Sequence, residues 1–175
     1  MFVCAGQSEQ FDFAAPIGIG LVEAAIRTTR LCIEERPEEL TFIGTAGSYG
    51  TIGLMEIVET QTATNIENGF FEGKTFSPIE TIISFANDVS RETIVNSSTY
   101  ITQDAPSAQQ YLKHGISLEN MELYAIFKVA QAFGIPVRGI LIVTNYCYAN
   151  AHEEFLARHA EAMERLSQYI RSRHA

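Results

Sequence analysis

The chain has 175 residues, of which 46% are hydrophobic, and it carries a formal net charge of −9 with an isoelectric point near 4.9. This length and composition suffice to bury the core of one domain, so we expect a single domain over residues 1–175. Lysine and arginine form no cluster, so the acidic chain lacks the positive surface of a nucleic-acid-binding protein. We therefore expect no nucleic-acid partner.

The three cysteines, Cys4, Cys32 and Cys147, occur at spacings that match no metal-binding motif. An odd number of isolated cysteines favours reduced, buried thiols over a disulfide scaffold, which indicates a cytoplasmic protein. The apolar runs are much shorter than the ~18 residues that a membrane-spanning helix needs. We therefore expect a soluble protein with no membrane partner.

The first part of the chain predicts a strand, a helix and a second strand. Residues 1–5 are an apolar run that ends at Gly6 and predict the first strand. A stripe at helical spacing indicates the helix, and Pro37 ends it. The stripe consists of Leu21, Ala24, Ala25, Thr28, Leu31 and Cys32. Residues 40–44 predict the second strand.

The middle of the chain gives weaker patterns. Residues 54–62 and 92–97 are rich in β-branched residues and predict further strands. Residues 65–87 are ambiguous in secondary structure. Residues 107–114 predict a short helix.

The last third alternates helices with an apolar strand. Ser117 is expected to cap a helix that ends at Gly134, and residues 137–143 predict a continuous buried strand. One face of that helix carries Glu122, Ile126, Val129, Ala130 and Phe133. A long charged helix is expected over residues 151–172. Its inward residues are Phe155, Leu156, His159, Met163, Leu166 and Ile170. This alternation predicts an α/β fold with a mixed, mostly parallel central sheet flanked by helices on both faces.

Three segments follow the predicted strands, where an open α/β sheet holds its ligand. They are the glycine-rich turn 44–50, residues 97–103 and the turn after Val143. The first, GTAGSYG, offers backbone N–H groups and the hydroxyls of Thr45 and Ser48 to a phosphate or a ribose. It lacks the lysine of a P-loop, and a strand-to-loop crossing that needs small residues is the alternative interpretation.

Three polar or aromatic residues are further candidates for ligand contact. Glu122 shares a helix face with apolar side chains, and a buried carboxylate costs free energy unless a group such as a ligand diol donates hydrogen bonds to it. The alternative interpretation is that the Glu122 carboxylate pairs with the dipole of the helix. Asn145 can donate to an acceptor of a heterocyclic ring and accept from a donor of that ring, or it can form a turn. Tyr100 can stack on a heterocycle or pack at a strand end.

These pieces together resemble the nucleoside phosphorylase superfamily, in the branch of purine nucleoside phosphorylases and methylthioadenosine/S-adenosylhomocysteine nucleosidases. IGIGLVEAAI, from Ile17, is similar to the Gly-Ile-Gly helix start of the family, and FIGTAGSYG resembles its strand and glycine-rich turn. LENMELYAIFKVAQAFGIPVRGILIVTNY resembles its Glu-Met-Glu helix and the following strand. The resemblance implies cleavage of the N-glycosidic bond of a purine nucleoside, by phosphorolysis or hydrolysis, with release of the free base.

On the sugar side, the resemblance implies that Glu122 grips the ribose 2′ and 3′ hydroxyls and that Met121 lies under the sugar. Thr45, in the same segment as Gly47, matches the hydroxyl that faces phosphate or the attacking water. Glu9 can stand in for the water-activating glutamate of the hydrolases, or it can be a surface-loop carboxylate. No metal or organic cofactor is implied, and inorganic phosphate is the co-substrate if the protein is a phosphorylase.

On the base side, the resemblance implies that Tyr100 and Ile101 belong to the segment that stacks on the purine. Asn145 matches the aspartate that protonates or hydrogen-bonds N7 of the base. An amide can hydrogen-bond the base but has no acidic proton to deliver, and branches that act on 6-oxopurines use asparagine for base contact. Asn145 and Glu122 are therefore the expected catalytic residues. Family members assemble as homo-oligomers, so we expect a dimer or larger.

The sequence also departs from the family pattern. Only residues 1–15 precede the Gly-Ile-Gly motif, Phe42 stands where phosphorylases place a phosphate-binding arginine, and Asn120 replaces the first glutamate of the Glu-Met-Glu trio. Arg27 and Arg30 are expected to face solvent, and loss of cations weakens phosphate binding. Two alternatives therefore stay open: a nucleoside-binding relative without turnover, and an unrelated flavodoxin-like or dinucleotide-binding protein, although a complete G-x-G-x-x-G fingerprint is lacking.

Overall fold

The computed structural model describes residues 1–173. The first half of the chain forms β1 (Phe2–Cys4), β2 (Ala15–Pro16), α1 (Leu21–Glu35), β3 (Leu40–Ser48), β4 (Ile57–Thr60), β5 (Thr62–Thr64), α2 (Asn68–Phe71) and β6 (Ile82–Ser84). The second half forms the 3-10 helix η1 (Val89–Arg91), β7 (Ile94–Ser97), α3 (Ala105–Lys113), β8 (Ile116–Asn120), α4 (Leu123–Phe133), β9 (Val137–Tyr146) and α5 (Ala151–Arg173). None of the helices in this range is both long and apolar enough to cross a membrane.

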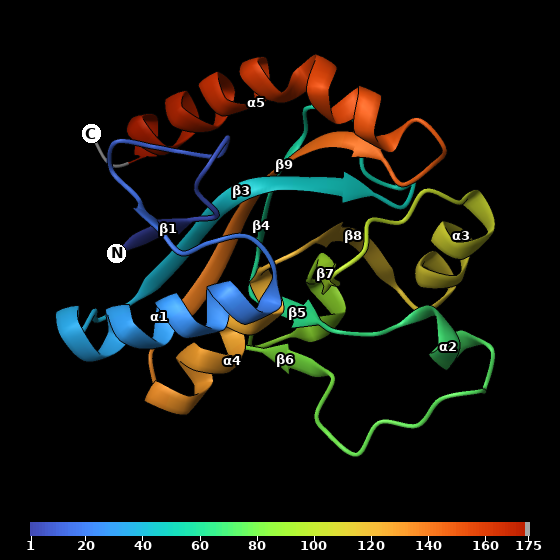
Figure 1. Cartoon of the computed structure of the whole chain (residues 1–175), viewed down its shortest axis with the longest axis horizontal. Helices are drawn as coiled ribbons and strands as arrows, with labels where there is room; N and C mark the ends of the chain where they lie inside the picture. Colours follow the sequence, from blue (N-terminus) through green and yellow to red (C-terminus); the bar gives the residue numbers. More distant parts are fainter. Residues whose placement is uncertain (174–175) are drawn as a thin grey trace.

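Nine strands within the described residues form one sheet. Its main path is β2-β1-β3-β8-β7-β5-β6, with β9 paired to β3 and β4 paired to β9 (Figure 1). Five of the strand pairs are parallel and three are antiparallel. The predicted α/β fold with a mixed, mostly parallel sheet is confirmed.

Strands β3 and β9 form the middle of the core, with helices on both faces (Figure 1). On one face, α5 packs against the two strands through a buried cluster that includes Ile43, Ile140, Ile142, Ala162, Leu166 and Ile170. On the other face lie α1 and α4, which bury the larger cluster around Phe42, Leu141 and Val143. The stripe predicted for α1 is confirmed, because its buried residues are Ala24, Thr28 and Cys32.

Both central strands are longer than the sequence predicts. β3 continues through the glycine-rich segment to Ser48, and β9 continues to Tyr146, so the turns predicted after Ile43 and Val143 are wrong. The two strands pair in parallel along their whole length, with a register shift between Ala46 and Gly47. Hydrogen bonds between the strands supply the regular structure that a run of small residues does not favour by itself.

The start of α4 also differs from the prediction. Ser117 lies in β8 and caps no helix, because residues 116–120 pair with β7 and, at their end, with β3. α4 begins at Leu123, and Glu122 is its N-cap residue. The first free N–H groups of the helix are satisfied by Asn120 Oδ1, which accepts from Leu123 at 3.3 Å, and by Ser97 Oγ, which accepts from Tyr124 at 2.9 Å. The predicted helix end is confirmed, since Gly134 takes the left-handed C-cap conformation.

Three smaller predictions have mixed outcomes. The predicted strand 54–62 is divided between β4 and the start of β5, and the predicted helix 107–114 is confirmed as α3. The ambiguous residues 65–87 hold α2 and β6. Leu156 was expected to face inward on α5, but 62% of it is exposed, because α5 turns only a narrow stripe toward the sheet.

Candidate active site

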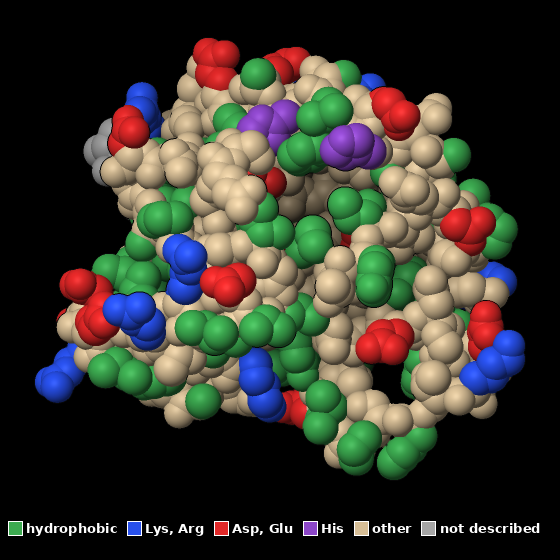
Figure 2. All heavy atoms as spheres, in the orientation of Figure 1, with side chains coloured by type: hydrophobic (Ala, Val, Ile, Leu, Met, Phe, Trp, Pro, Cys, Tyr) green, Lys and Arg blue, Asp and Glu red, His purple; other side chains and the backbone are tan. Residues whose placement is uncertain are grey.

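A cavity of about 260 Å³ lies where the carboxyl ends of β3 and β9 meet the end of β8. Its mouth appears in Figure 2 as a hollow below α5, bordered by hydrophobic and histidine side chains, with carboxylates at its floor. The structure brings together around it all eight site residues proposed from the sequence. They are Glu9, Thr45, Gly47, Tyr100, Ile101, Met121, Glu122 and Asn145.

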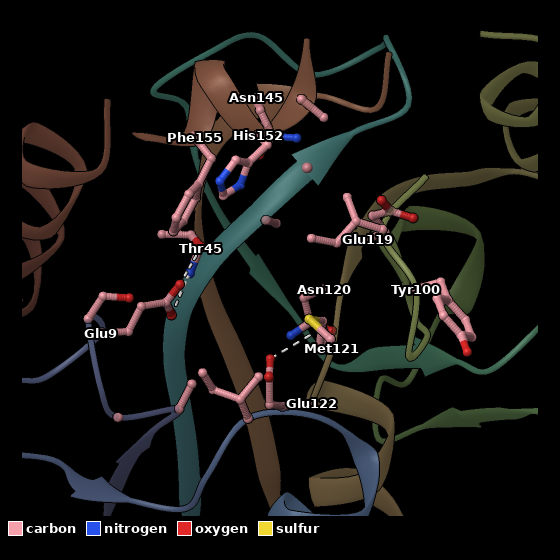
Figure 3. Close-up of a pocket in the computed structure, with 18 residues that line it drawn as sticks. Glu9, Thr45, Tyr100, Glu119, Asn120, Met121, Glu122, Asn145, His152 and Phe155 are labelled. Carbon is pink, nitrogen blue, oxygen red and sulfur yellow. Dashed lines mark hydrogen bonds between the residues drawn. The ribbon is translucent and has the colours of Figure 1, made fainter. Parts of the chain in front are cut away.

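Glu9 occupies one side of the cavity, beside β3 (Figure 3). The Thr45 backbone N–H donates to Glu9 Oε2 at 3.2 Å, and the Thr45 hydroxyl donates to Oε1. A Cβ atom at position 44 would lie 2.7 Å from Glu9 Oε2, which explains why Gly44 precedes Thr45. Burial raises the pKa of the Glu9 carboxyl above its ordinary value. The interpretation of Glu9 as a surface-loop carboxylate is therefore wrong.

A tight turn holds Glu9 in this position. The Gly6 N–H donates to the Glu9 carbonyl at 3.1 Å, and the Glu9 N–H donates to the Gly6 carbonyl at 3.0 Å. Gln7, inside the turn, has a φ of 55°, which is a costly backbone conformation for a residue other than glycine. This turn therefore directs the Glu9 carboxylate toward β3 at some cost in backbone free energy.

Glu122 lies at the lower end of the cavity in Figure 3 and is only 6% exposed. Its Oε1 accepts a 2.9 Å hydrogen bond from the backbone N–H of Gly20, and its Oε2 accepts a 3.2 Å bond from that of Met121. Burial raises the pKa of Glu122 to about 7, and the negative charge of Glu9 adds to the rise. Each of its oxygens can accept further hydrogen bonds from a ligand.

Asn145 lies at the opposite end of the cavity, near His152 and Phe155 (Figure 3). The Thr144 hydroxyl donates to Asn145 Oδ1 at 3.0 Å, and Asn145 Nδ2 donates to the Tyr146 carbonyl at 3.2 Å. These bonds fix the orientation of the amide and leave one N–H of Nδ2 free to bond a ligand. The Nδ2 atom lies 3.0 Å from where a Cβ on Gly47 would be, so glycine there leaves the amide room.

Tyr100 and Ile101 form part of the rim. Both belong to the segment between β7 and α3, and they are 86% and 51% exposed. The structure therefore places the proposed stacking residue at the open side of the cavity, across from Glu9 (Figure 3).

Glu119, Phe155 and His152 are among the residues of the cavity wall that the sequence did not identify as site residues. Glu119, on β8, was hidden by the wrong assignment of residues 117–122 to a helix, although a glutamate between Leu118 and Asn120 in a strand is unusual. Phe155 was expected to pack in the core, but it lines the cavity from the second turn of α5. His152 lies one turn earlier, and nothing in a single sequence distinguishes it from a surface histidine.

The cavity is electronegative. Of the described residues, those that line it include three glutamates and one histidine but neither lysine nor arginine. Arg27 and Arg30 face solvent as expected, and each pairs with a glutamate of α1. Phe42 is fully buried in the core and contributes no charge. Within residues 1–173, no group of histidine, cysteine, aspartate and glutamate side chains could hold a metal ion.

Comparison with known proteins points to one family. The model of the phosphorylase superfamily matches residues 12–172. No curated protein matches the sequence significantly.

Several solved structures share the fold at low sequence identity. Futalosine hydrolase of Helicobacter pylori strain 26695 has a TM-score of 0.83 at 14% identity, covering 98% of this chain and 94% of that chain. The 5′-methylthioadenosine/S-adenosylhomocysteine nucleosidase of Helicobacter pylori has a TM-score of 0.82 at 13% identity, covering 98% and 95%. The nucleosidase of Streptococcus pneumoniae in complex with 8-aminoadenine has a TM-score of 0.76 at 15% identity, covering 97% and 95%.

Proposed function

The chain belongs to the phosphorylase superfamily, and on that premise we propose that it is a nucleosidase, which hydrolyses the N-glycosidic bond of a purine nucleoside and releases the free base. The observation that carries the proposal is the pairing of Glu9 with Thr45 in the same electronegative cavity as Glu122. Two of the structural neighbours are nucleosidases and one is a hydrolase, which favours the same chemistry. Membership of the family removes the flavodoxin-like alternative.

Glu122 supports the binding of the sugar. Its carboxylate is held in place by the N–H groups of Gly20 and Met121, and it still has acceptor sites toward the cavity. The vicinal 2′ and 3′ hydroxyls of a ribose are two donors at the spacing of two carboxylate oxygens. Bonds to an ionised carboxylate are strong, and they fix the ring while the glycosidic bond breaks.

Glu9 supports water as the acceptor of the sugar. The N–H and hydroxyl of Thr45, which would otherwise be available to a phosphate, already donate to the Glu9 carboxylate. A phosphate dianion would enter a cavity with three glutamates and no lysine or arginine among the described lining residues. Burial raises the pKa of the Glu9 carboxyl, which makes its carboxylate a stronger base toward a water molecule.

Asn145 supports contact with the base. Its free N–H can donate to N7 of a purine, and a 6-oxopurine offers O6 as a second acceptor on the same edge.

In the proposed reaction, water adds to the anomeric carbon and passes a proton to Glu9. The electron pair of the C–N bond leaves with the base, which takes a proton from solvent. The amide stabilises the charge that develops on the base, and we propose a preference for 6-oxopurine nucleosides.

We further propose that the protein is cytoplasmic, as its isolated cysteines indicate, and that it is a homo-oligomer, as the family resemblance implies. The exposure of Tyr100 and Ile101 at the rim favours a second subunit that covers the open side. Sedimentation equilibrium would show a dimer or larger; a monomer at micromolar concentration would contradict the proposal.

The test of function is product analysis. Inosine, adenosine and methylthioadenosine would each be incubated with the protein, with and without added inorganic phosphate. We expect release of the free base together with the free sugar, which is ribose from inosine and adenosine and methylthioribose from methylthioadenosine. Phosphate should not increase the rate, and release should be faster for inosine than for adenosine. Release that requires phosphate and yields ribose 1-phosphate would instead show a phosphorylase. Nucleoside binding by calorimetry without any release would show the non-catalytic relative.

A further inference from the structure

We infer that Glu119 is a positioning residue, which holds the segment of Tyr100 and Ile101 over the base through two hydrogen bonds from Thr102. This inference rests on the proposed function only in assuming that the segment of Tyr100 and Ile101 covers the base of a nucleoside. The hydrogen bonds themselves do not depend on what the cavity binds.

The Glu119 carboxylate forms a clamp on Thr102. Its Oε1 accepts from the Thr102 backbone N–H at 2.8 Å, and its Oε2 accepts from the Thr102 hydroxyl at 2.8 Å. Oε2 also accepts from the Tyr49 hydroxyl at 2.8 Å. The residue is only 5% exposed. Hydrogen bonds to an ionised and desolvated acceptor are stronger than neutral ones, so the clamp is a firm attachment.

The anchor is rigid because Glu119 sits inside the sheet. Its backbone lies opposite Gly47 of β3 on one side and opposite Asn96 of β7 on the other. It therefore connects the clamp to the same strand that carries Thr45. Burial, together with the charge of Glu119, raises the pKa of the Tyr49 hydroxyl, which keeps that group a donor toward the carboxylate.

Apart from the clamp, the segment is held at its two ends. The Ser98 N–H donates to the Asn120 carbonyl at 3.2 Å, and the Asp104 side chain accepts from the Ser107 N–H at the start of α3. Residues 98–104 form no helix or strand, and the side chains of Tyr100 and Ile101 are mostly exposed, so core packing does not fix them. The Ser98 hydroxyl donates to the Tyr100 carbonyl at 2.8 Å, which is a local bond within the segment. Thr102 comes directly after Ile101, so a bond at Thr102 sets where both rim residues lie. In Figure 3, Glu119 and Tyr100 lie on the same side of the cavity.

The first experiment measures mobility without any substrate. The chain contains no tryptophan, so Tyr100→Trp introduces a single tryptophan, which can be excited selectively over the tyrosines and whose anisotropy reports the motion of this segment. In that background, Glu119→Gln and Thr102→Val are expected to lower the anisotropy, whereas Thr102→Ser keeps the hydroxyl and is expected to preserve it. Tyr49→Phe is the matched control, because it removes the third bond to Glu119 without touching the segment.

The second experiment measures base binding in the otherwise native chain. Thr102→Val and Glu119→Gln are expected to raise KM for the nucleoside and the inhibition constant of the free base about tenfold, which is the loss of one good hydrogen bond. Inhibition by ribose is expected to stay unchanged, and Thr102→Ser is expected to behave like the native protein. Circular dichroism checks that each variant is folded. If Glu119→Gln does not fold, Thr102→Val alone tests the inference.

Two results would overturn the inference. One is unchanged anisotropy in both Glu119→Gln and Thr102→Val. The other is an equal loss in Tyr49→Phe, because the cluster would then stabilise the whole region and not position the segment. If the proposed function alone fails, the anisotropy changes remain and only the changes in KM disappear.

Discussion

The Glu122 carboxylate accepts a 2.9 Å hydrogen bond from the backbone N–H of Gly20, a residue 102 positions earlier in the chain. Gly20 has a φ of 84°, a conformation that favours glycine, and this conformation presents its N–H to the cavity just before α1 begins. The Gly-Ile-Gly motif and the Asn-Met-Glu motif are therefore two halves of one structural unit, the end of the cavity assigned to the sugar.

Stability should depend on the ionisation of Glu122. Its pKa is about 7 in the folded protein against an ordinary 4.5, so the folded state binds this proton more tightly than the unfolded chain. Its contribution is thus most favourable below pH 4.5, decreases as the pH rises, and is lost above about pH 7. Relative to the native protein, Glu122→Gln is expected to gain on the order of 3 kcal/mol of unfolding free energy between these limits.

Urea unfolding at a series of pH values would measure this gain. Glu23→Gln, on the exposed face of α1, is the control and should follow the native curve. If the unfolding free energies of Glu122→Gln and of the native protein change in parallel with pH across this range, the pKa of the buried carboxyl is not raised.

Removal of the charge at Glu122 should also reduce discrimination between sugars. Because a hydrogen bond to an ionised acceptor contributes about 1.5–3 kcal/mol, the native protein is expected to prefer inosine over 2′-deoxyinosine by roughly 10- to 100-fold in kcat/KM. In Glu122→Gln this ratio should fall to a few-fold. Comparing the ratio between the two proteins cancels the intrinsic difference in reactivity of the substrates. A ratio that stays the same would mean that Glu122 does not contact the diol.

Glu9→Gln should separate catalysis from binding. If Glu9 takes the proton of the attacking water, its loss is expected to lower kcat by roughly 10²- to 10⁴-fold while KM changes little. Steady-state kinetics with inosine would measure both. The control is Glu56→Gln, an exposed glutamate that also accepts from a backbone N–H, that of Gly53, but lies outside the cavity. Nearly native kcat in Glu9→Gln would assign activation of water to another group.

Gly47→Ala should damage the base end of the cavity. The added Cβ would lie 2.8 Å from Cys147 Sγ and 3.0 Å from Asn145 Nδ2, so one of these side chains has to move. We expect a loss of about 1–3 kcal/mol in unfolding free energy, as for other overpacked cores. We also expect a loss of roughly tenfold or more in kcat/KM, as catalytic geometry tolerates little displacement.

Gly53→Ala is the matched control for this variant. Its Cβ would meet the end of the exposed Glu56 side chain at 3.2 Å, and that side chain can move away. Native kinetics in both glycine variants would show that the close approach of Gly47 and Asn145 has no role in base contact.

The sequence by itself determined the features that depend on neighbouring residues in the chain. The apolar stripe fixed α1, and the glycine at the end of α4 fixed where that helix stops, because hydrophobic periodicity and helix caps act over a few residues. The unusual position of Glu122 among apolar residues also pointed to the cavity, even though the helix was predicted to begin too early.

Only the tertiary structure decided the features that depend on pairing between distant segments. β3 and β9 run on through Thr45 and Asn145 because each supplies hydrogen bonds to the other, and β8 forms where a helix was predicted because β3 and β7 pair with it. Burial of Glu9 against Thr45, 36 residues away, follows from the same packing. Such contacts outweigh local propensity, because hydrogen bonding and burial in the assembled sheet contribute more free energy than the preference of a short segment.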